Sequence, residues 1–109
     1  NVADAIPLFD GPPNELSISY NDYLGSYLAV HSYNTDGKQV GRTPPEPWGP
    51  WSEPTTLWTV EAHEGKKYPV AAYAGKEHPS HAEDGGRVIY LTYVEAEEYF
   101  PHLIEVTLA

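Results

Sequence analysis

The chain of 109 residues is long enough for one domain with a modest core, and it carries a formal net charge of −10. This acidity opposes nucleic-acid binding, because phosphates would meet a repulsive field. The chain has no cysteine, which excludes a disulfide framework, a thiolate metal site and a thiol nucleophile. Its apolar runs are far shorter than the roughly 20 residues that cross a bilayer, so we expect a soluble protein with no membrane partner.

The N-terminal residues 1–14 read as an extended arm. They contain three prolines and a glycine around one short apolar stretch, AIPLF. The segment lacks the basic start and the apolar centre of a signal peptide, and the chain does not begin with methionine. We therefore expect a fragment of a longer protein from which any targeting segment has been removed.

After the arm, β-branched and aromatic residues recur in short runs separated by turn-forming residues, a pattern typical of strands. The expected strands span residues 16–20, 26–33, 39–43, 55–60, 68–75, 87–94 and 102–109. Residues 95–100, EAEEYF, have some helical character but form too short a stretch to be stable alone. The sequence therefore predicts an all-β protein.

The strand groups repeat along the chain. LSISY, a turn and then YLAVHSY resemble YPVAAYAG, a loop and then VIYLTYV, with Gly25 and Gly86 at matching places. The repeat predicts two antiparallel, four-stranded blades of a β-propeller, over about 15–60 and 68–109, with a β-sandwich as the alternative. Two blades cannot close a ring, so further blades of a parent chain, or copies of this chain, are expected to complete it.

Three stretches carry a family resemblance: SISYNDYLGSYLAVHSYN, GPWSEPTTLW and YAGKEHPSHAEDGGRVIYLTY. Over roughly residues 15–108 they resemble the last two blades of five-bladed, arabinanase-type β-propeller glycosidases, particularly bacterial secreted domains related to endo-arabinanases. The resemblance implies a secreted or periplasmic, glycoside-hydrolase-like protein whose partner is carbohydrate. It also implies that the catalytic carboxylates lie on earlier blades absent from this chain, so that this portion supplies cleft wall and fold closure.

In some members of that group a histidine near the central channel helps to hold calcium, and His78 matches its position. The loop around it, from Glu77 to Asp84, contains two imidazoles and three carboxylates, which could bind a divalent ion or act as an acid–base pair. The simpler interpretation is a solvated polar loop. Five acidic residues are catalytic candidates by type alone, and none has a distinguishing spacing: Glu46, Glu53, Glu77, Glu83 and Asp84.

The segment PPEPWGPWSEP, residues 44–54, concentrates prolines around Trp48 and Trp51. The favoured interpretation is structural: the prolines stiffen the passage from a third to an outer fourth strand, and the indoles cover the seam between blades. An alternative is a platform on which a sugar ring stacks. A further alternative is PPEPW as a ligand for a proline-recognising domain.

Among the remaining candidates, His31 lies in mid-strand and either points into a channel or packs in the core beside a tyrosine. Arg42 and Arg87 are the only arginines, and each is expected to pair with an acid or to contact a sugar hydroxyl. Trp48, Trp51, His31 and Arg87 are thus the predicted substrate-binding residues. A non-catalytic module that assembles through exposed strand edges and aromatic surface is the alternative function.

Overall fold

The fold is described by a computed structural model, which covers residues 1–10, 13–33, 36–65, 67 and 72–109. Its strands are β1 (Pro13–Asn21), β2 (Ser26–Tyr33), β3 (Lys38–Arg42), β4 (Thr55–Thr59), β5 (Ala72–Glu77), β6 (Val88–Glu95) and β7 (Phe100–Thr107). Short 3-10 helices are η1 (Val2–Asp4), η2 (Pro79–His81) and η3 (Asp84–Gly86). In the described part of the chain, no helix is long and apolar enough to cross a membrane. The protein is all-β, as predicted.

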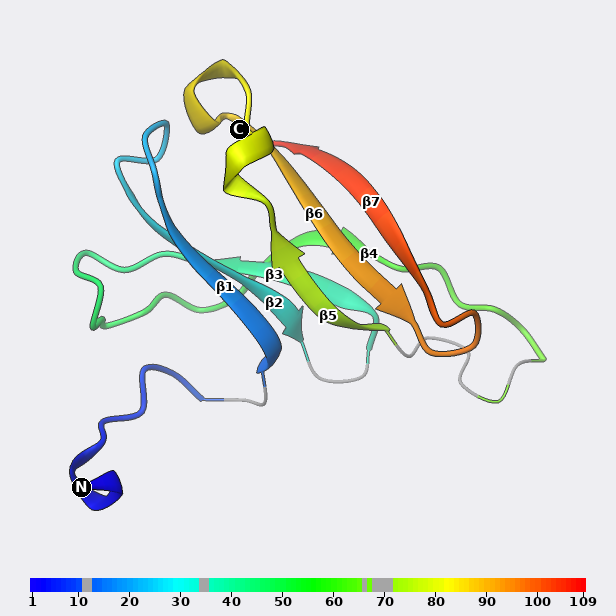
Figure 1. Cartoon of the computed structure of the whole chain (residues 1–109), viewed down its shortest axis with the longest axis horizontal. Coiled ribbons are helices and arrows are strands. Elements are labelled where there is room, and N and C mark those ends of the chain that lie inside the picture. Colours follow the sequence, from blue (N-terminus) through cyan, green and yellow to red (C-terminus); the bar gives the residue numbers. More distant parts are fainter. Residues whose placement is uncertain (11–12, 34–35, 66, 68–71) are drawn as a thin grey trace.

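The strands form two antiparallel sheets in chain order, as Figure 1 shows. The first sheet has the order β1-β2-β3-β4, and the second has the order β5-β6-β7. Within each sheet, every strand pairs with the next one along the chain, because antiparallel neighbours need only a short connection. This meander is the strand order within a propeller blade. The two sheets fit adjacent blades or a β-sandwich, and they do not close a ring.

The predicted strands correspond to the observed ones, with small differences in the residues at which they begin and end. A strand was expected over residues 68–75, whereas β5 is described from Ala72 and continues to Glu77. Residues 68–71 lie outside the described part. The expected absence of a helix over residues 95–100 is confirmed, since β6 and β7 meet there through a turn.

The matching glycines of the repeat also occupy equivalent places. Gly25 immediately precedes β2, and Gly86 lies just before β6. Both have positive φ, +61° and +94°, in the region where glycine avoids the strain of a Cβ atom. The side chain of Asn21 links the two places, because its Nδ2 donates to Gly86 O at 2.8 Å.

The hydrophobic core lies between the two sheets. Side chains alternate along β2, so Leu28 and Val30 face the second sheet. There they form a buried cluster with Ile89 and Leu91 of β6. The partly buried side chains that pack against it come from β4 and the C-terminal segment: Leu57, Ile104, Val106 and Leu108. Burying each of the four fully buried side chains contributes about 1.5–3 kcal/mol, and this burial holds the sheets together.

β5 contacts the first sheet through a polar junction. The backbone N of Gly75 donates to Ser32 Oγ at 3.0 Å, and Ser32 Oγ donates to Gln39 Oε1 at 2.9 Å. A Cβ atom at Gly75 would lie only 2.1 Å from Gln39 Oε1 and 2.6 Å from the backbone N of Ser32. The close approach of β5 to β2 therefore depends on glycine.

The same junction continues to the end of β5. Its last residue, Glu77, is 2% exposed, and its backbone N donates to Ser17 Oγ at 2.8 Å. Ser19 Oγ donates to Glu77 Oε2 at 3.1 Å. Three serines of β1 and β2 thus connect the sheets by hydrogen bonds beside the apolar core.

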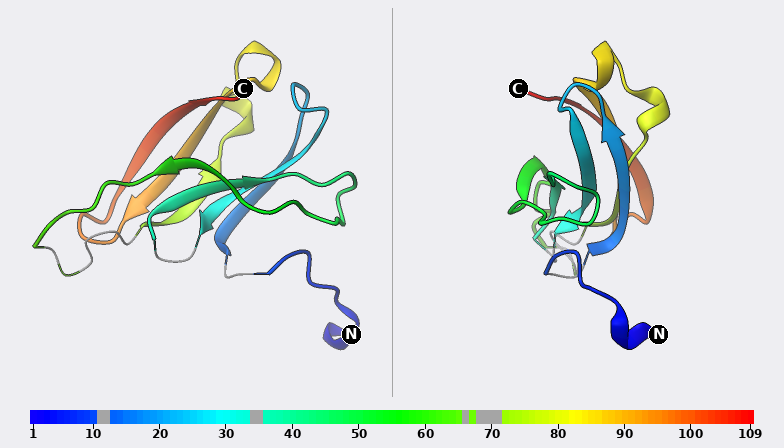
Figure 2. Two further views of the ribbon diagram at one scale, coloured as in Figure 1. Left: turned by 180° about the vertical axis from the view of Figure 1, so that it is seen from behind. Right: turned by 90° about the vertical axis from the view of Figure 1, so that its left-hand side faces the viewer.

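The N-terminal arm and the proline-rich segment lie outside this core. Figure 2 shows the first residues extending away from both sheets, and Val2 and Ile6 are strongly exposed. Residues 43–54 connect β3 to β4, as predicted, and the connection is closed at its base by Ser52 N donating to Thr43 O at 2.9 Å. Phe9 of the arm returns to the first sheet, where it helps to form the site described next.

Candidate functional site

The first candidate site is built around Arg42, on the face of the first sheet opposite the core. Arg42 ends β3 and is 6% exposed. Its Nε donates to His31 Nε2 at 3.2 Å, its Nη1 to Ser52 O at 3.2 Å, and its Nη2 to Asp10 O at 3.3 Å. The guanidinium group of Arg42 is therefore contacted by strand β2, by the proline-rich segment and by the N-terminal arm.

His31 supports Arg42 as a neutral imidazole. Because Arg42 Nε carries a hydrogen, His31 Nε2 must accept, and the ring proton then lies on Nδ1. Nδ1 in turn donates to Ser32 O at 2.9 Å. Burial lowers the pKa of His31, and the charge of Arg42 lowers it further, although the bond to Ser32 O opposes the shift. His31 is buried, and its side-chain hydrogen-bonding partner is an arginine and not a tyrosine.

Aromatic rings surround the guanidinium. Its central carbon lies 4.6 Å from the centroid of the Phe9 ring and 5.9 Å from that of Tyr33. Phe9 also stacks on His31 and meets the ring of Trp51 edge-on, with centroids 5.5 and 5.8 Å apart. Stacking on π faces offsets part of the cost of burying this cation.

The expectation that Arg42 pairs with an acid is wrong. No carboxylate of the described residues lies within ion-pair distance of it, so backbone carbonyls, an imidazole and aromatic faces take that place. Arginine has five N–H groups, and three of them are used here. The described residues give the other two no partner, which leaves donors for a ligand.

A hollow of about 340 Å³ lies beside this arginine. Its walls come from the arm, the first sheet and the proline-rich segment: Leu8, Phe9, Asp10, Tyr33, Arg42, Pro50, Trp51 and Glu53. The hollow thus combines aromatic faces with a guanidinium and two acidic residues. The Nε1 of Trp51 is also buried and has no hydrogen-bond partner within the described ranges.

The five predicted site residues are not brought together. Trp51 lines the Arg42 hollow, and His31 is buried and bonded to Arg42 without lining it. Trp48 is 72% exposed and does not line the hollow. Arg87 lies beside the C-terminal segment, where its Nε donates to Leu108 O at 3.3 Å and its Nη1 lies 3.7 Å from Asp84 Oδ2. The expected pairing of Arg87 with an acid is therefore present. The prediction that both indoles cover a seam between blades is not supported for the exposed Trp48.

His78 lines a second hollow, on the outer face of the second sheet. This hollow measures about 370 Å³ and is lined by His78, His81, Glu83, Tyr90, Thr92 and Leu103. His78 Nε2 lies 2.8 Å from Thr92 Oγ1, and the His78 and His81 rings have centroids 6.4 Å apart. Two imidazoles beside one carboxylate suit hydrogen bonding to a polar ligand. Calcium takes six to eight oxygen ligands, whereas the residues lining this hollow include one carboxylate, Glu83. Calcium binding at His78 therefore stays a prediction.

Among the five acidic candidates, the structure distinguishes Glu77 by its burial. Burial raises the pKa of the Glu77 carboxyl, and the hydrogen bond from Ser19 lowers it by a smaller amount. Glu77 also lines a third hollow, of about 240 Å³, with Tyr20, Asp22 and the 79–86 loop. Its serine partners give it a clear role in joining the sheets.

The strongest site residues that the sequence did not single out are Phe9 and Tyr33. Phe9 belongs to the arm, 33 positions before Arg42, and only tertiary structure places it over the guanidinium. Tyr33 carried a usable signal, because it shares a strand face with His31. Arg42 was recognisable as one of only two arginines in an acidic chain.

A comparison with curated proteins gave no match to this chain. A comparison with protein families matched residues 1–105 to the family described as "Domain of unknown function (DUF4185)". The match extends from the arm through both sheets into β7, and so includes all three hollows. On this match, the chain belongs to the DUF4185 family.

Proposed function

We propose that this chain is part of a secreted or periplasmic, carbohydrate-active β-propeller of the glycoside-hydrolase type, in which it forms one wall of the substrate cleft. The observation that carries the proposal is the Arg42 hollow. It presents a fixed guanidinium, aromatic rings and carboxylates in one concave surface of about 340 Å³. Concave sites with aromatic walls and a few convergent polar groups are typical of small-molecule binding.

The chemistry of the hollow suits a sugar. The faces of sugar rings carry C–H groups that pack on aromatic rings, and their hydroxyls accept from arginine and donate to carboxylates. Trp51 and Phe9 supply the aromatic surface, and Arg42 supplies the donors. Glu53 and Asp10 add acceptors. Phosphorylated polymers suit it less well, because the chain has a formal net charge of −10.

The proposal assigns binding, and not bond cleavage, to the described hollow. Hydrolysis requires two carboxyl groups on opposite sides of a glycosidic bond, and the proposal places these on blades outside this chain. Wall residues still contribute to catalysis, because contacts to remote parts of a substrate hold the reacting bond in position.

The test is to titrate the chain with arabinan-derived oligosaccharides and to measure binding by NMR and calorimetry. Arg42→Lys keeps the charge but loses the planar set of donors, and a lost charged hydrogen bond costs about 1.5–3 kcal/mol, or about tenfold or more in Kd. Glu53→Gln, at the exposed rim, should also weaken binding. Arg87→Lys is the matched control and should bind as the wild type does. Absence of sugar binding, or equal loss in the control, would contradict the proposal.

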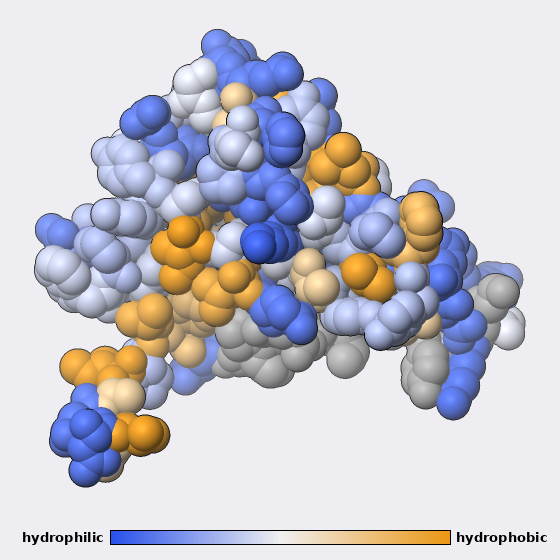
Figure 3. Space-filling view, viewed as in Figure 1, coloured by the Kyte–Doolittle hydropathy of each residue, from blue (hydrophilic) through white to orange (hydrophobic). Residues whose placement is uncertain are grey.

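A second candidate function, assembly with another sheet, is supported by a separate observation. Leu16, Ile18 and Tyr20 point to the same side of β1 as Ala29 and His31 point on β2, and each of the three is 39–56% exposed. Figure 3 shows hydrophobic side chains gathered over β1. An apolar row of this kind is typical of an interface, either with a further blade or with a second copy of the chain.

Assembly is tested by measuring molar mass in solution for the wild type and for Ile18→Asp. A wild type that associates and a variant that stays monomeric would support it. A monomeric wild type with no partner blade in its native material would count against it.

A further inference from the structure

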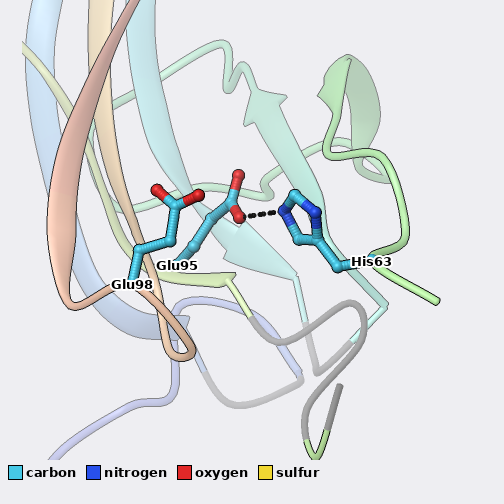
Figure 4. Close-up of side chains that lie close together, drawn as sticks. All are labelled: His63, Glu95 and Glu98. Atoms are coloured by element: carbon cyan, nitrogen blue, oxygen red, sulfur yellow. Dashed lines mark hydrogen bonds and ion pairs between the residues drawn. The ribbon is translucent and has the colours of Figure 1, made fainter. Parts of the chain in front are cut away.

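A cluster of metal-ligating side chains lies away from all three hollows. His63 follows β4, Glu95 ends β6, and Glu98 lies in the turn between β6 and β7. Figure 4 shows their side chains converging, with a hydrogen bond between His63 Nε2 and Glu95 Oε2. One ligand atom from each residue lies within 4.8 Å of the other two. Residues from two separate parts of the chain therefore meet at one point.

A fourth side chain, His102 of β7, borders the cluster. Its Nε2 lies 2.9 Å from Glu98 Oε2 and 3.8 Å from Glu95 Oε1. The His102 ring stacks on Tyr93, with centroids 5.2 Å apart and an interplanar angle of 9°. His102 is thus held in place by packing, and it is positioned to orient the carboxylate of Glu98.

Glu95 is the group that makes this cluster unusual. Its side chain is 9% exposed, and its two oxygens face two different imidazoles. A buried carboxylate is costly without a cation or several donors. A divalent cation would neutralise Glu95 and Glu98 together, and would not require either imidazole to be protonated.

We propose that His63, Glu95 and Glu98 bind a zinc-type divalent cation, with His102 donating to Glu98 from outside the ligand set. One imidazole and two carboxylates are a ligand set that zinc accepts, whereas calcium takes oxygen ligands almost exclusively. A hydrogen bond from His102 to a ligating carboxylate is the outer contact that such sites commonly have.

The geometry allows the site to close on a metal. Zinc–ligand distances of about 2.0–2.1 Å in a tetrahedron place donor atoms about 3.3 Å apart. The hydrogen-bonded pair of His63 Nε2 and Glu95 Oε2 must open to this separation, and the Glu98 oxygen, within 4.8 Å of both ligand atoms, needs only a modest approach. The side chains of His63 and Glu98 are 40% and 46% exposed, so they are free to move while Glu95 stays fixed. Their exposure also leaves a fourth position accessible to water.

Such a metal would have a structural consequence. It would tie the segment after β4, at the edge of the first sheet, to the β6–β7 turn of the second sheet. This cross-link lies outside the Arg42 hollow and is independent of the proposed sugar binding.

The test is calorimetric titration of the metal-stripped chain with Zn²⁺, and separately with Ca²⁺ and Mg²⁺. The proposal expects one Zn²⁺ per chain, with Kd raised at least tenfold by His63→Ala and by Glu98→Gln. Glu98 is exposed, so its replacement by glutamine preserves the fold. His81→Ala, which removes an exposed histidine from the hollow lined by His78, should leave the Kd for Zn²⁺ unchanged.

Co²⁺ provides a second readout, since its visible absorption reports coordination by imidazole and carboxylate. Bound Co²⁺ should give a low-coordinate spectrum that is lost in Glu98→Gln and retained in His81→Ala. No Zn²⁺ binding, Zn²⁺ binding that both site variants leave unchanged, or Ca²⁺ binding as tight as Zn²⁺ binding would overturn the proposal.

Discussion

Replacing Gly75 with alanine tests whether the contact of β5 with the first sheet depends on the absence of a side chain. The new Cβ would lie 2.1 Å from Gln39 Oε1, 2.6 Å from the backbone N of Ser32 and 2.8 Å from Ser32 Oγ. Ordinary contact begins near 3.4 Å, so these atoms must separate by about 0.6–1.3 Å in a packed interior. One of them belongs to the backbone of β2, and a change of rotamer cannot move it.

The expected cost follows from two contributions. Overpacking a tight interior costs about 1–3 kcal/mol, and losing the hydrogen bond from Gly75 N to Ser32 Oγ adds about 1 kcal/mol. We therefore expect Gly75→Ala to lower the free energy of unfolding by about 2–4 kcal/mol. For a domain of this size the melting temperature should fall by roughly 8 °C or more.

Denaturant and thermal unfolding, followed by tryptophan fluorescence and circular dichroism, measure this change. Gly41→Ala is the matched control, because its Cβ would meet only the ends of the Leu28 and Leu57 side chains, both at 3.2 Å. These ends can shift, so the control should lose less than about 1 kcal/mol. If Gly75→Ala is no less stable than Gly41→Ala, the polar junction is looser than the structure indicates and the reasoning fails.

Two further predictions concern Glu77 and the tryptophans. Burial raises the pKa of Glu77 in the folded state, so its contribution to stability is present below the unfolded pKa near 4.5 and is lost as pH rises through the folded pKa. Glu77→Gln should therefore unfold at a higher denaturant concentration than the wild type at neutral pH. If the variant is more stable than the wild type by the same amount at acidic pH, the raised pKa of Glu77 is not the cause. Trp48→Ala should change the free energy of unfolding by less than about 0.5 kcal/mol, whereas Trp51→Ala should lower it by about 3 kcal/mol. Equal losses of stability in chemical denaturation would contradict the exposed position of Trp48 and the packed position of Trp51.

Much of the fold could be predicted from local sequence patterns. Strand-forming residues alternate with turn formers, and within each sheet every strand pairs with its neighbour in the chain, so element type and strand order within a sheet follow from short-range preferences. The equivalence of Gly25 and Gly86 was visible for the same reason, because each position requires positive φ at the start of a strand. The end of β5 at Glu77 was harder to predict, since Lys and Glu are depleted in strands.

The candidate sites could be predicted only in part from the sequence, because they depend on contacts between distant segments. Trp51 and His31 were predicted as binding residues, and both border Arg42, but the arm that completes the hollow comes from residues 8–10. Trp48 lies three positions from Trp51 and has the same local composition, yet it is exposed. Residue type cannot separate the two indoles, whereas packing against Phe9 does.

The sequence by itself determined the all-β class, the strand order and the acidity that opposes nucleic acid, since these depend on local propensity, spacing and total charge. The tertiary structure decided which polar groups meet. It placed Arg42 against aromatic rings, bonded the Glu77 carboxylate to a serine of another strand, and joined His63 to Glu95. Each of these contacts links residues from different strands or loops, and the packing of two sheets, which no local pattern encodes, brings them within a few ångströms of each other.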